Sequence, residues 1–314
     1  MSDLVSAIIP TYRRPAALDR SLGSVLRQTW RPLELVVVDD GSGDNTPEVL
    51  AAWADKAKAA GVEYQWHTKE NGGPGAARNY GMECAKGELF AFLDDDDRWY
   101  PQKIETQVAH LKMHSDSGVS FTRYVHAGKE DQPKPRMENI RDGWVFDTLC
   151  SGETRAHLQT LMIRRAVFEH TGGFAPHRNF EDFEFCLRSS LEFPFTAVAE
   201  ALTVIETVES SVSREAGLEG DLERDSLKLK VLREFRQKHG RHERYHEPAM
   251  QQALARVYDE HIKHFIWLGR VDEARKAWDD AIKECGDQPQ LAGLKGKLKR
   301  ATVAGWFGRR LKKP

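Results

Sequence analysis

The first hundred residues alternate between short apolar runs and segments with helical spacing, and this alternation constrains the fold more than any other feature. Buried strands are predicted over four apolar runs: Leu4–Ile9, Glu34–Val38, Val62–His67 and Glu88–Leu93. Helices are predicted over three segments between them: Ala16–Gln28, Thr46–Ala60 and Ala76–Ala85. Strands and helices that alternate in this way form a parallel, doubly wound sheet, so the sequence predicts an α/β fold.

The rest of the chain keeps this mixed pattern up to about Ser213 and then becomes helical. Before that point we expect a helix from Pro101 to His114, strands over Gly118–Tyr124 and Leu158–Arg164, and a helix over Phe180–Glu192. After it, three helices are predicted: Leu222–Lys238, Pro248–Leu268 and Val271–Cys285. The change of pattern predicts a domain boundary within residues 214–220.

Charge and cysteine content argue against several classes of protein. The formal net charge is −2, whereas a protein that neutralises many nucleic-acid phosphates needs a basic excess. The four cysteines are far apart and form no CxxC pair, which disfavours a zinc site and a disulfide framework. The N-terminus lacks the pattern of a signal peptide, and no apolar run is long enough to span a membrane. We therefore expect a cytoplasmic protein.

Polar residues stand where three of the predicted strands end. They are Pro10-Thr11-Tyr12, Asp39-Asp40-Gly41 and the run Asp94–Asp97. Ligands of doubly wound sheets bind at the carboxyl ends of the parallel strands. We therefore expect these three clusters to lie at one edge of the sheet and to form a site.

The run of four aspartates, Asp94–Asp97, allows two interpretations. Adjacent carboxylates raise one another's pKa, and a bound cation relieves that repulsion. Carboxylates select hard ions such as Mg²⁺ or Mn²⁺. Alternatively, the run is a solvated loop before the next predicted helix, because helix N-termini favour acidic residues. The run alone does not decide between a metal site and a solvated loop.

Three further residues at this edge also have a functional and an ordinary interpretation. Tyr12 offers a flat face for a nucleotide base, although a tyrosine after a strand commonly packs against the protein. Asp40 can accept a hydrogen bond from a base, although an aspartate before glycine is a common turn former. Arg78 follows the glycine-rich segment Asn71–Gly75 and can pair with a phosphate or with a surface carboxylate.

The first 213 residues resemble family 2 glycosyltransferases, which have the GT-A fold. Six segments carry the resemblance, in this order: IIPTYRR, VVVDDGSGD, NGGPGAARNYG, FLDDDDRW, GGF and NFEDFEFCLR. The resemblance implies a Rossmann-like, mostly parallel sheet flanked by helices. It implies a catalytic domain over residues 1–215, with a nucleotide-binding half (1–100) and an acceptor half (101–215). A helical extension would occupy residues 216–314.

The resemblance also implies how a nucleotide is bound. Tyr12 would stack on the base and Asp40 would hydrogen-bond it, while Pro10 and Thr11 would shape the pocket through their backbone. Arg78 would lie near the base or the diphosphate.

The segment FLDDDDRW occupies the position of the family's DxD motif. Asp94 and Asp95 would face the ribose and the metal, and Asp96 would be the principal ligand of Mn²⁺ or Mg²⁺. The doubled acids leave open which pair does most of the coordination. Many family members complete the metal shell with a histidine where this chain has Val208, so the last ligand is unassigned.

Asp182, with Glu181 before it, falls where the family keeps its general base. Displacement at the anomeric carbon needs a carboxylate on the acceptor side to take the hydroxyl proton. The implied outcome is inversion, so that an α-linked donor gives a β-linked product. Alternatively, the two acids only begin a helix. Four residues are expected near the acceptor or the donor sugar: His157, Gln159, Gly173 and Glu181.

The C-terminal segment 291–314 has a basic amphipathic pattern. Eight Lys or Arg and no acidic residue follow residue 288, and Leu291, Leu294 and Leu298 recur at helical spacing. Such a helix is suited to lie on an anionic membrane surface, here the inner face of the cytoplasmic membrane. The sequence favours equally a solvated tail or a helix that packs on the protein.

The resemblance, together with the polar residues at the strand ends, implies an inverting glycosyltransferase. It would move a hexose or N-acetylhexosamine from a nucleotide diphosphate, by family expectation UDP, to a hydroxyl of a glycan or lipid-linked acceptor. Bacterial surface polysaccharide synthesis is the expected setting. A nucleotidyltransferase is one alternative, but it would have a glycine-rich loop after the first strand, and PTYRRPAAL has no glycine. A non-catalytic nucleotide-sugar-binding or scaffold protein is the other, and it would not need Asp40, the acidic run and Asp182 together.

Overall fold

The computed structural model describes residues 4–177, 179–206, 217–306 and 311. The chain divides into two compact units, one with residues 1–145 and 153–208 and the other with residues 146–152 and 209–314. The short helix α6 (Phe146–Ser151) therefore groups with the C-terminal helices, which the sequence did not indicate.

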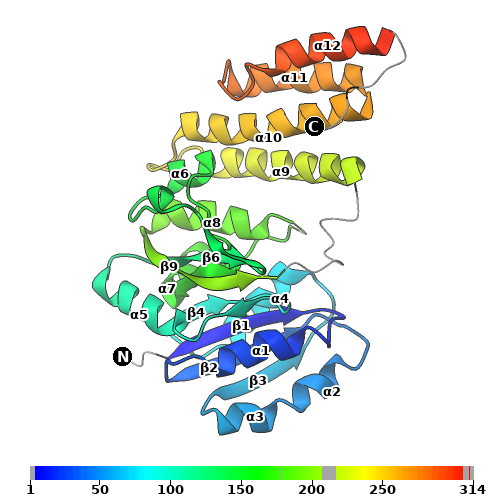
Figure 1. The fold of residues 1–314 in the computed structure, drawn as a ribbon. Helices are drawn as coiled ribbons and strands as arrows, with labels where there is room; N and C mark the ends of the chain where they lie inside the picture. Colours follow the sequence, from blue (N-terminus) through cyan, green and yellow to red (C-terminus); the bar gives the residue numbers. More distant parts are fainter. Residues whose placement is uncertain (1–3, 178, 207–216, 307–310, 312–314) are drawn as a thin grey trace. The chain divides into compact units, whose positions relative to one another are not determined.

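The described part of the first unit forms a nine-stranded sheet in the order β3-β2-β1-β4-β8-β6-β9-β5, with β7 paired to β6 (Figure 1). Four strands are mutually parallel, as predicted: β1 (Val5–Thr11), β2 (Leu33–Asp39), β3 (Glu63–Thr68) and β4 (Leu89–Phe92). The remaining strands are β5 (Arg98–Trp99), β6 (Val119–His126), β7 (Lys129–Lys134), β8 (Leu161–Arg164) and β9 (Phe195–Ile205). Of these, β8 is antiparallel to both β4 and β6.

Seven α-helices accompany the sheet in the described part of this unit: α1 (Leu18–Leu26), α2 (Thr46–Ala51), α3 (Ala54–Ala59), α4 (Pro74–Cys84), α5 (Lys103–Met113), α7 (Arg165–Thr171) and α8 (Glu181–Glu192). The sequence predicted one helix over 46–60, and the structure divides it into α2 and α3. The Leu50 carbonyl would bond Ala54 in a continuous helix, but here it accepts the Tyr64 hydroxyl at 2.9 Å and the Trp53 N–H at 3.1 Å.

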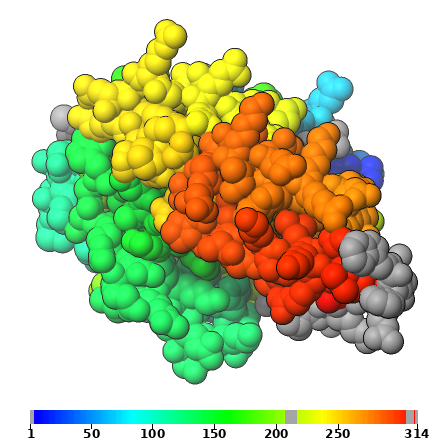
Figure 2. All heavy atoms as spheres, turned by 90° about the horizontal axis from the view of Figure 1, so that it is seen from above, coloured from blue at the N-terminus to red at the C-terminus, as the bar shows by residue number. Residues whose placement is uncertain are grey.

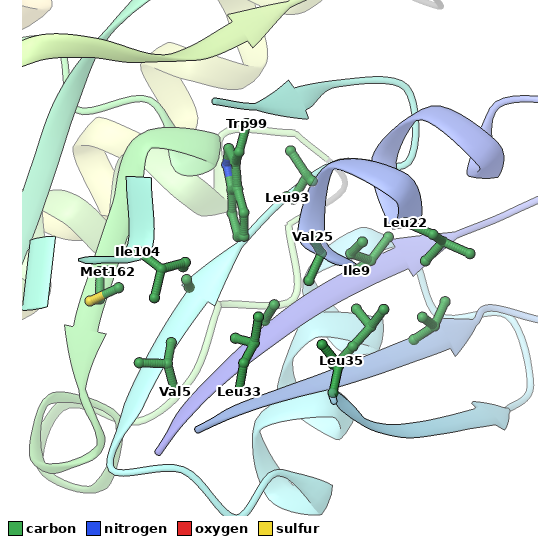
Figure 3. Close-up of a cluster of buried hydrophobic side chains, with 14 of the residues drawn as sticks. Val5, Ile9, Leu22, Val25, Leu33, Leu35, Leu93, Trp99, Ile104 and Met162 are labelled. Carbon is green, nitrogen blue, oxygen red and sulfur yellow. The ribbon is translucent and has the colours of Figure 1, made fainter. Parts of the chain in front are cut away.

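Helices cover both faces of the parallel strands. On one face Ile9 of β1 lies beside Leu22 and Val25 of α1, within a fully buried cluster (Figure 3). On the other face α4 approaches closely, because a Cβ on Gly81 would lie 2.7 Å from Cγ2 of Ile8, so only glycine fits there. With both faces covered, the carboxyl ends of the strands are the place where polar side chains can gather.

The second unit is helical. Besides α6 it contains α9 (Gly217–His239), α10 (Glu247–Leu268), α11 (Val271–Cys285) and α12 (Leu294–Trp306). Helix α10 packs against each of the other four. Among the described residues, no helix has the length and apolar character needed to cross a bilayer.

Helix α12 packs on its own unit, beside α11 (Figure 2). Leu291, Leu294 and Leu298 are 0%, 1% and 7% exposed, so the leucines of the amphipathic pattern are covered by protein, whereas Val303 of α12 is exposed. Lys295 and Lys299 face outward. The basic side of this helix is thus the side left open.

Candidate active site

The parallel strands β1, β2 and β4 end at a common edge, where the predicted polar residues meet. Thr11 pairs with Asp39 across β1 and β2, and the chain after β4 stays beside β1 through the N–H of Leu93, which donates to Ile8 at 3.1 Å. The Thr11 hydroxyl donates to the Asp95 carboxylate at 2.7 Å. The structure therefore brings the last residue of β1 and the acidic run into direct contact.

Arg14 is a member of this site that the sequence analysis did not assign. Its Nη1 lies 2.8 Å from Oδ2 of Asp96 and 3.3 Å from Oδ1 of Asp95. Burial opposes the charge of Arg14, but the carboxylates outweigh burial and raise the pKa of Arg14. The one available signal was its position just after the predicted first strand, at the edge where the acidic run also begins.

The buried aspartates of the run resist ionisation. Burial, with the neighbouring acids, raises the pKa of Asp95 to about 6 and that of Asp97 to about 8. Burial and the charge of Asp94 also raise the pKa of Asp96. The charge of Arg14 offsets part of the repulsion between these acids. An added cation would stabilise their ionised forms further.

The acidic run fits a metal ion shared with a substrate. The described residues contain no group of three or more His, Cys, Asp or Glu that would hold an ion alone. Mg²⁺, however, usually binds through one or two carboxylates together with substrate phosphates. The side chains of Asp94 and Asp96 are 29% and 19% exposed, whereas Asp95 and Asp97 are buried. Asp94 and Asp96 are thus the carboxylates that a shared ion could reach.

Arg78 on α4 joins the acidic run to the start of α8. One guanidinium nitrogen lies 2.6 Å from Asp94 and another lies 2.9 Å from Glu181. Burial disfavours the charge of Arg78, but the two carboxylates prevail and its pKa is raised. Burial also raises the pKa of Glu181, against the influence of Arg78. In this structure Arg78 is therefore a buried residue that links Asp94 to Glu181, and it is not open to a phosphate.

Asp182 lies in the first turn of α8, directly after Glu181, and is half-buried. The helix begins after Phe180, which adopts a left-handed backbone conformation with φ of 66°. One Asp182 oxygen accepts the N–H of Phe183 at 2.7 Å. Through Glu181 and Arg78, the candidate base is held close to the acidic run.

Gln159 and His157 line the same region from the segment before β8. The Gln159 amide nitrogen donates to Oδ2 of Asp94, while its oxygen is buried and has no hydrogen-bond partner among the described residues. His157 packs edge-on against Tyr124, with ring centroids 4.6 Å apart. Gln159 is thus in direct contact with the acidic run.

Asp40 and Tyr12, the predicted base-binding residues, differ in how open they are. Asp40 is 3% exposed, and it accepts the N–H groups of Gly72 and Gly73 at the start of α4 and the Lys69 ammonium at 2.9 Å. Its role toward a base stays a prediction, and a base would have to replace some of these partners. The Tyr12 side chain is 40% exposed.

Gly173 has a tight structural role. A Cβ at this position would lie 2.2 Å from Oδ1 of Asn79, which itself exchanges two hydrogen bonds with the backbone of Phe174. The predicted contact of Gly173 with a sugar stays a prediction. Val208, where a metal-binding histidine was expected, lies outside the described residues.

Comparison with known sequences points to one family. Residues 6–180 match the sequence model of "Glycosyl transferase family 2". An uncharacterised glycosyltransferase of Rickettsia typhi is 42% identical over 178 residues, which are 55% of this chain and 54% of that protein. The putative teichuronic acid biosynthesis glycosyltransferase TuaG of Bacillus subtilis is 32% identical over 169 residues, which cover 54% of this chain and 64% of TuaG. The match thus spans about half of the Rickettsia protein.

Solved structures are similar over nearly the whole chain. TarS residues 1–349 of S. aureus, in complex with UDP-GlcNAc, matches with a TM-score of 0.56 and 18% identity, over 97% of this chain and 92% of that one. The mannosyltransferase PcManGT of Pyrobaculum calidifontis, in complex with GDP-Man and Mn²⁺, matches with a TM-score of 0.63 and 17% identity, over 98% and 88%. This likeness confirms the predicted GT-A fold with C-terminal helices.

Proposed function

This chain belongs to glycosyl transferase family 2, and on that premise we propose that it moves a sugar from a nucleotide diphosphate to an acceptor hydroxyl at the carboxyl edge of its sheet. One observation carries the proposal. A single guanidinium, that of Arg78, bonds both Asp94 of the acidic run and Glu181 beside Asp182. The carboxylate suited to the leaving diphosphate, Asp94, is therefore linked through Arg78 and Glu181 to the carboxylate suited to the attacking hydroxyl, Asp182.

In this proposal the donor is a UDP-sugar, with a hexose or N-acetylhexosamine as the transferred group. The TarS neighbour was solved with UDP-GlcNAc, although PcManGT was solved with GDP-Man. The exposed ring of Tyr12 offers a stacking surface at the strand ends, which suits a flat base. Asp40 would hydrogen-bond the base after giving up some of its present partners.

Asp94 and Asp96 would hold a divalent ion, Mn²⁺ or Mg²⁺, together with the donor's diphosphate. When bound, such an ion offsets the negative charge that develops on the leaving diphosphate. PcManGT was solved with Mn²⁺. Burial first, and the neighbouring carboxylates second, raise the pKa values of Asp95 and Asp97, and a cation beside the run would favour their ionised forms.

Asp182 would act as the general base. It takes the proton of the acceptor hydroxyl as that oxygen attacks the anomeric carbon, and the bond from this carbon to the diphosphate oxygen breaks. Attack from the side opposite the leaving group inverts the anomeric configuration. Glu181 is engaged with Arg78 and buried, so Asp182 is the freer of the two carboxylates.

The acceptor would be a glycan or lipid-linked glycan of surface polysaccharide synthesis; the name of the relative TuaG places that protein in teichuronic acid biosynthesis. If the enzyme works at a membrane, the exposed basic side of α12 would meet the anionic surface mainly by charge, because its leucines are buried. Replacing Lys295, Lys299 and Arg300 with glutamine should then weaken binding to anionic vesicles without affecting turnover of a soluble acceptor. Unchanged vesicle binding would exclude this mode of attachment.

The direct test is release of nucleoside diphosphate from a panel of UDP-, GDP- and dTDP-sugars, with and without Mn²⁺ or Mg²⁺. The proposal expects release with a UDP-sugar that stops when the metal is chelated and returns when it is restored. Failure to release nucleoside diphosphate from any donor, with metal and a range of glycan acceptors present, would contradict it.

A further inference from the structure

Three side chains spaced four residues apart bond three consecutive backbone carbonyls. The Trp99 indole nitrogen donates to the carbonyl of Gln159 at 2.8 Å. The Lys103 ammonium nitrogen donates to Leu161 at 3.2 Å, and the Gln107 amide donates to Thr160 at 3.0 Å. Lys103 and Gln107 are four residues apart in α5 and so lie on one face of that helix, while Trp99 comes from β5, just before it. Together they fix the backbone of residues 159–161.

All three donors are buried. Trp99 is 3% exposed, and Lys103 and Gln107 are fully buried. The Lys103 nitrogen also lies 4.0 Å from the centre of the Trp99 ring. Burying an amine without a carboxylate partner is costly, and burial lowers the pKa of Lys103 well below its ordinary value. An apolar side chain would fill this space at a lower free-energy cost. The hydrogen bond of Lys103 to the backbone therefore does more than fill the core.

The segment that these donors hold carries Gln159 into the candidate active site. Its amide nitrogen donates to Asp94, and its amide oxygen is buried without a partner in the described part of the chain. A buried acceptor beside a predicted substrate-binding carboxylate is suited to a hydroxyl that a bound substrate would supply. The position of this amide depends on the carbonyls at 159–161, which these three donors hold together with β8. The Thr203 hydroxyl of β9 also donates to the Gln159 carbonyl, at 3.2 Å, so the three donors share this role with β9.

We propose that Trp99, Lys103 and Gln107 are positioning residues, which hold Gln159 so that its amide orients Asp94 and accepts a hydroxyl of the donor sugar or acceptor. This inference rests on the proposed glycosyltransferase function. None of the three touches the reacting atoms, and they act on the reaction only through residue 159.

The test compares Lys103→Met and Gln107→Leu with the wild type. Each variant keeps apolar volume and removes one donor to the 159–161 backbone. We expect kcat to fall roughly 10- to 100-fold, because small misplacements of a substrate-contacting group cost about that much. The Kd for UDP with Mn²⁺, measured by calorimetry, should stay close to that of the wild type.

Arg165→Met is the matched control. Arg165 also stacks on an aromatic ring and donates to backbone carbonyls, those of Ala85 and Gly87, which precede β4 at the opposite edge of the sheet. It should lose stability in urea unfolding and keep its kcat. Trp99→Phe is the second variant if Lys103→Met does not fold, because it keeps an aromatic ring at this position while it removes the N–H donor and part of the side-chain volume.

A double-mutant cycle with Gln159→Ala separates positioning from general stability. If Lys103 acts through Gln159, adding Lys103→Met to Gln159→Ala should lower kcat by less than about twofold further. The positioning role would be overturned if the loss of kcat in the double variant equalled the product of the two single losses. It would also be overturned if Arg165→Met lost as much kcat as Lys103→Met. An inactive wild type that also binds no UDP would instead overturn the proposed function, and this inference with it.

Discussion

Replacing Arg78 with methionine tests whether its guanidinium ties the acidic run to the first turn of α8. The change keeps much of the side chain's length and removes both ion pairs, the 2.6 Å contact to Asp94 and the 2.9 Å contact to Glu181. Glu181 is then left as a buried carboxylate without its cation. The Asp94 side chain is 29% exposed, so water can replace part of what it loses.

Removing one partner of a buried ion pair costs about 3–5 kcal/mol. Most of this cost should come from Glu181, whose side chain is 8% exposed. We therefore expect the free energy of unfolding to fall by about 3–5 kcal/mol at pH 7. The loss should shrink as the pH is lowered, because Glu181 has a raised pKa and the folded state without Arg78 favours its protonated form.

Urea unfolding followed by tryptophan fluorescence measures this loss. Lys86→Met is the control, because the Lys86–Glu63 pair is 3.4 Å apart with both side chains more than half exposed, and it should cost less than about 1 kcal/mol. Adding Glu181→Gln to Arg78→Met should recover much of the stability, since the unpaired charge is gone. The reasoning is refuted if Arg78→Met costs no more than the control, or if the double variant is less stable than Arg78→Met.

Three further predictions concern single residues. Lys103→Met should change the pH dependence of stability. The lowered pKa of Lys103 means that burying the amine destabilises the folded protein most at low pH and progressively less as the pH rises toward 10.5, so in urea titrations the variant should gain more stability over the wild type at neutral pH than near pH 10. Asp96→Asn should raise the Mn²⁺ concentration for half-maximal turnover by roughly tenfold or more, and an unchanged titration would remove Asp96 from the metal site. Gly173→Ala should lower the free energy of unfolding by about 1–3 kcal/mol, because its Cβ would meet Asn79, and a neutral effect would show that the turn can shift.

The sequence predicted the parallel half of the sheet because its signals are local. Each of β1 to β4 is a short apolar run closed by residues that end strands, and buried strands of parallel sheets have this composition. Strand β9 (Phe195–Ile205) was not predicted. Its alanine, glutamate and leucine residues favour helices, and its pairing with β6 and β5 decides its conformation.

The candidate site was predictable to the extent that its residues follow strand ends. Asp94–Asp97 and Tyr12 have that signal. Arg14 also follows the first strand, but its contact with Asp96, which makes it part of the site, joins residues 82 apart in the sequence. The same applies to Gln159, whose bond to Asp94 spans 65 residues and depends on donors from β5 and α5. Such contacts come from tertiary structure, which local pattern does not specify.

The most direct test of the central claim is Asp182→Asn, assayed for donor binding and for sugar transfer in the same preparation. Asparagine keeps the shape of the side chain and cannot take the hydroxyl proton. We predict that the Kd for UDP-sugar with Mn²⁺ stays close to that of the wild type, while kcat falls about 10²- to 10⁴-fold, the usual contribution of a general base. Transfer at close to the wild-type rate by this variant would show that Asp182 is not the base and would contradict the account.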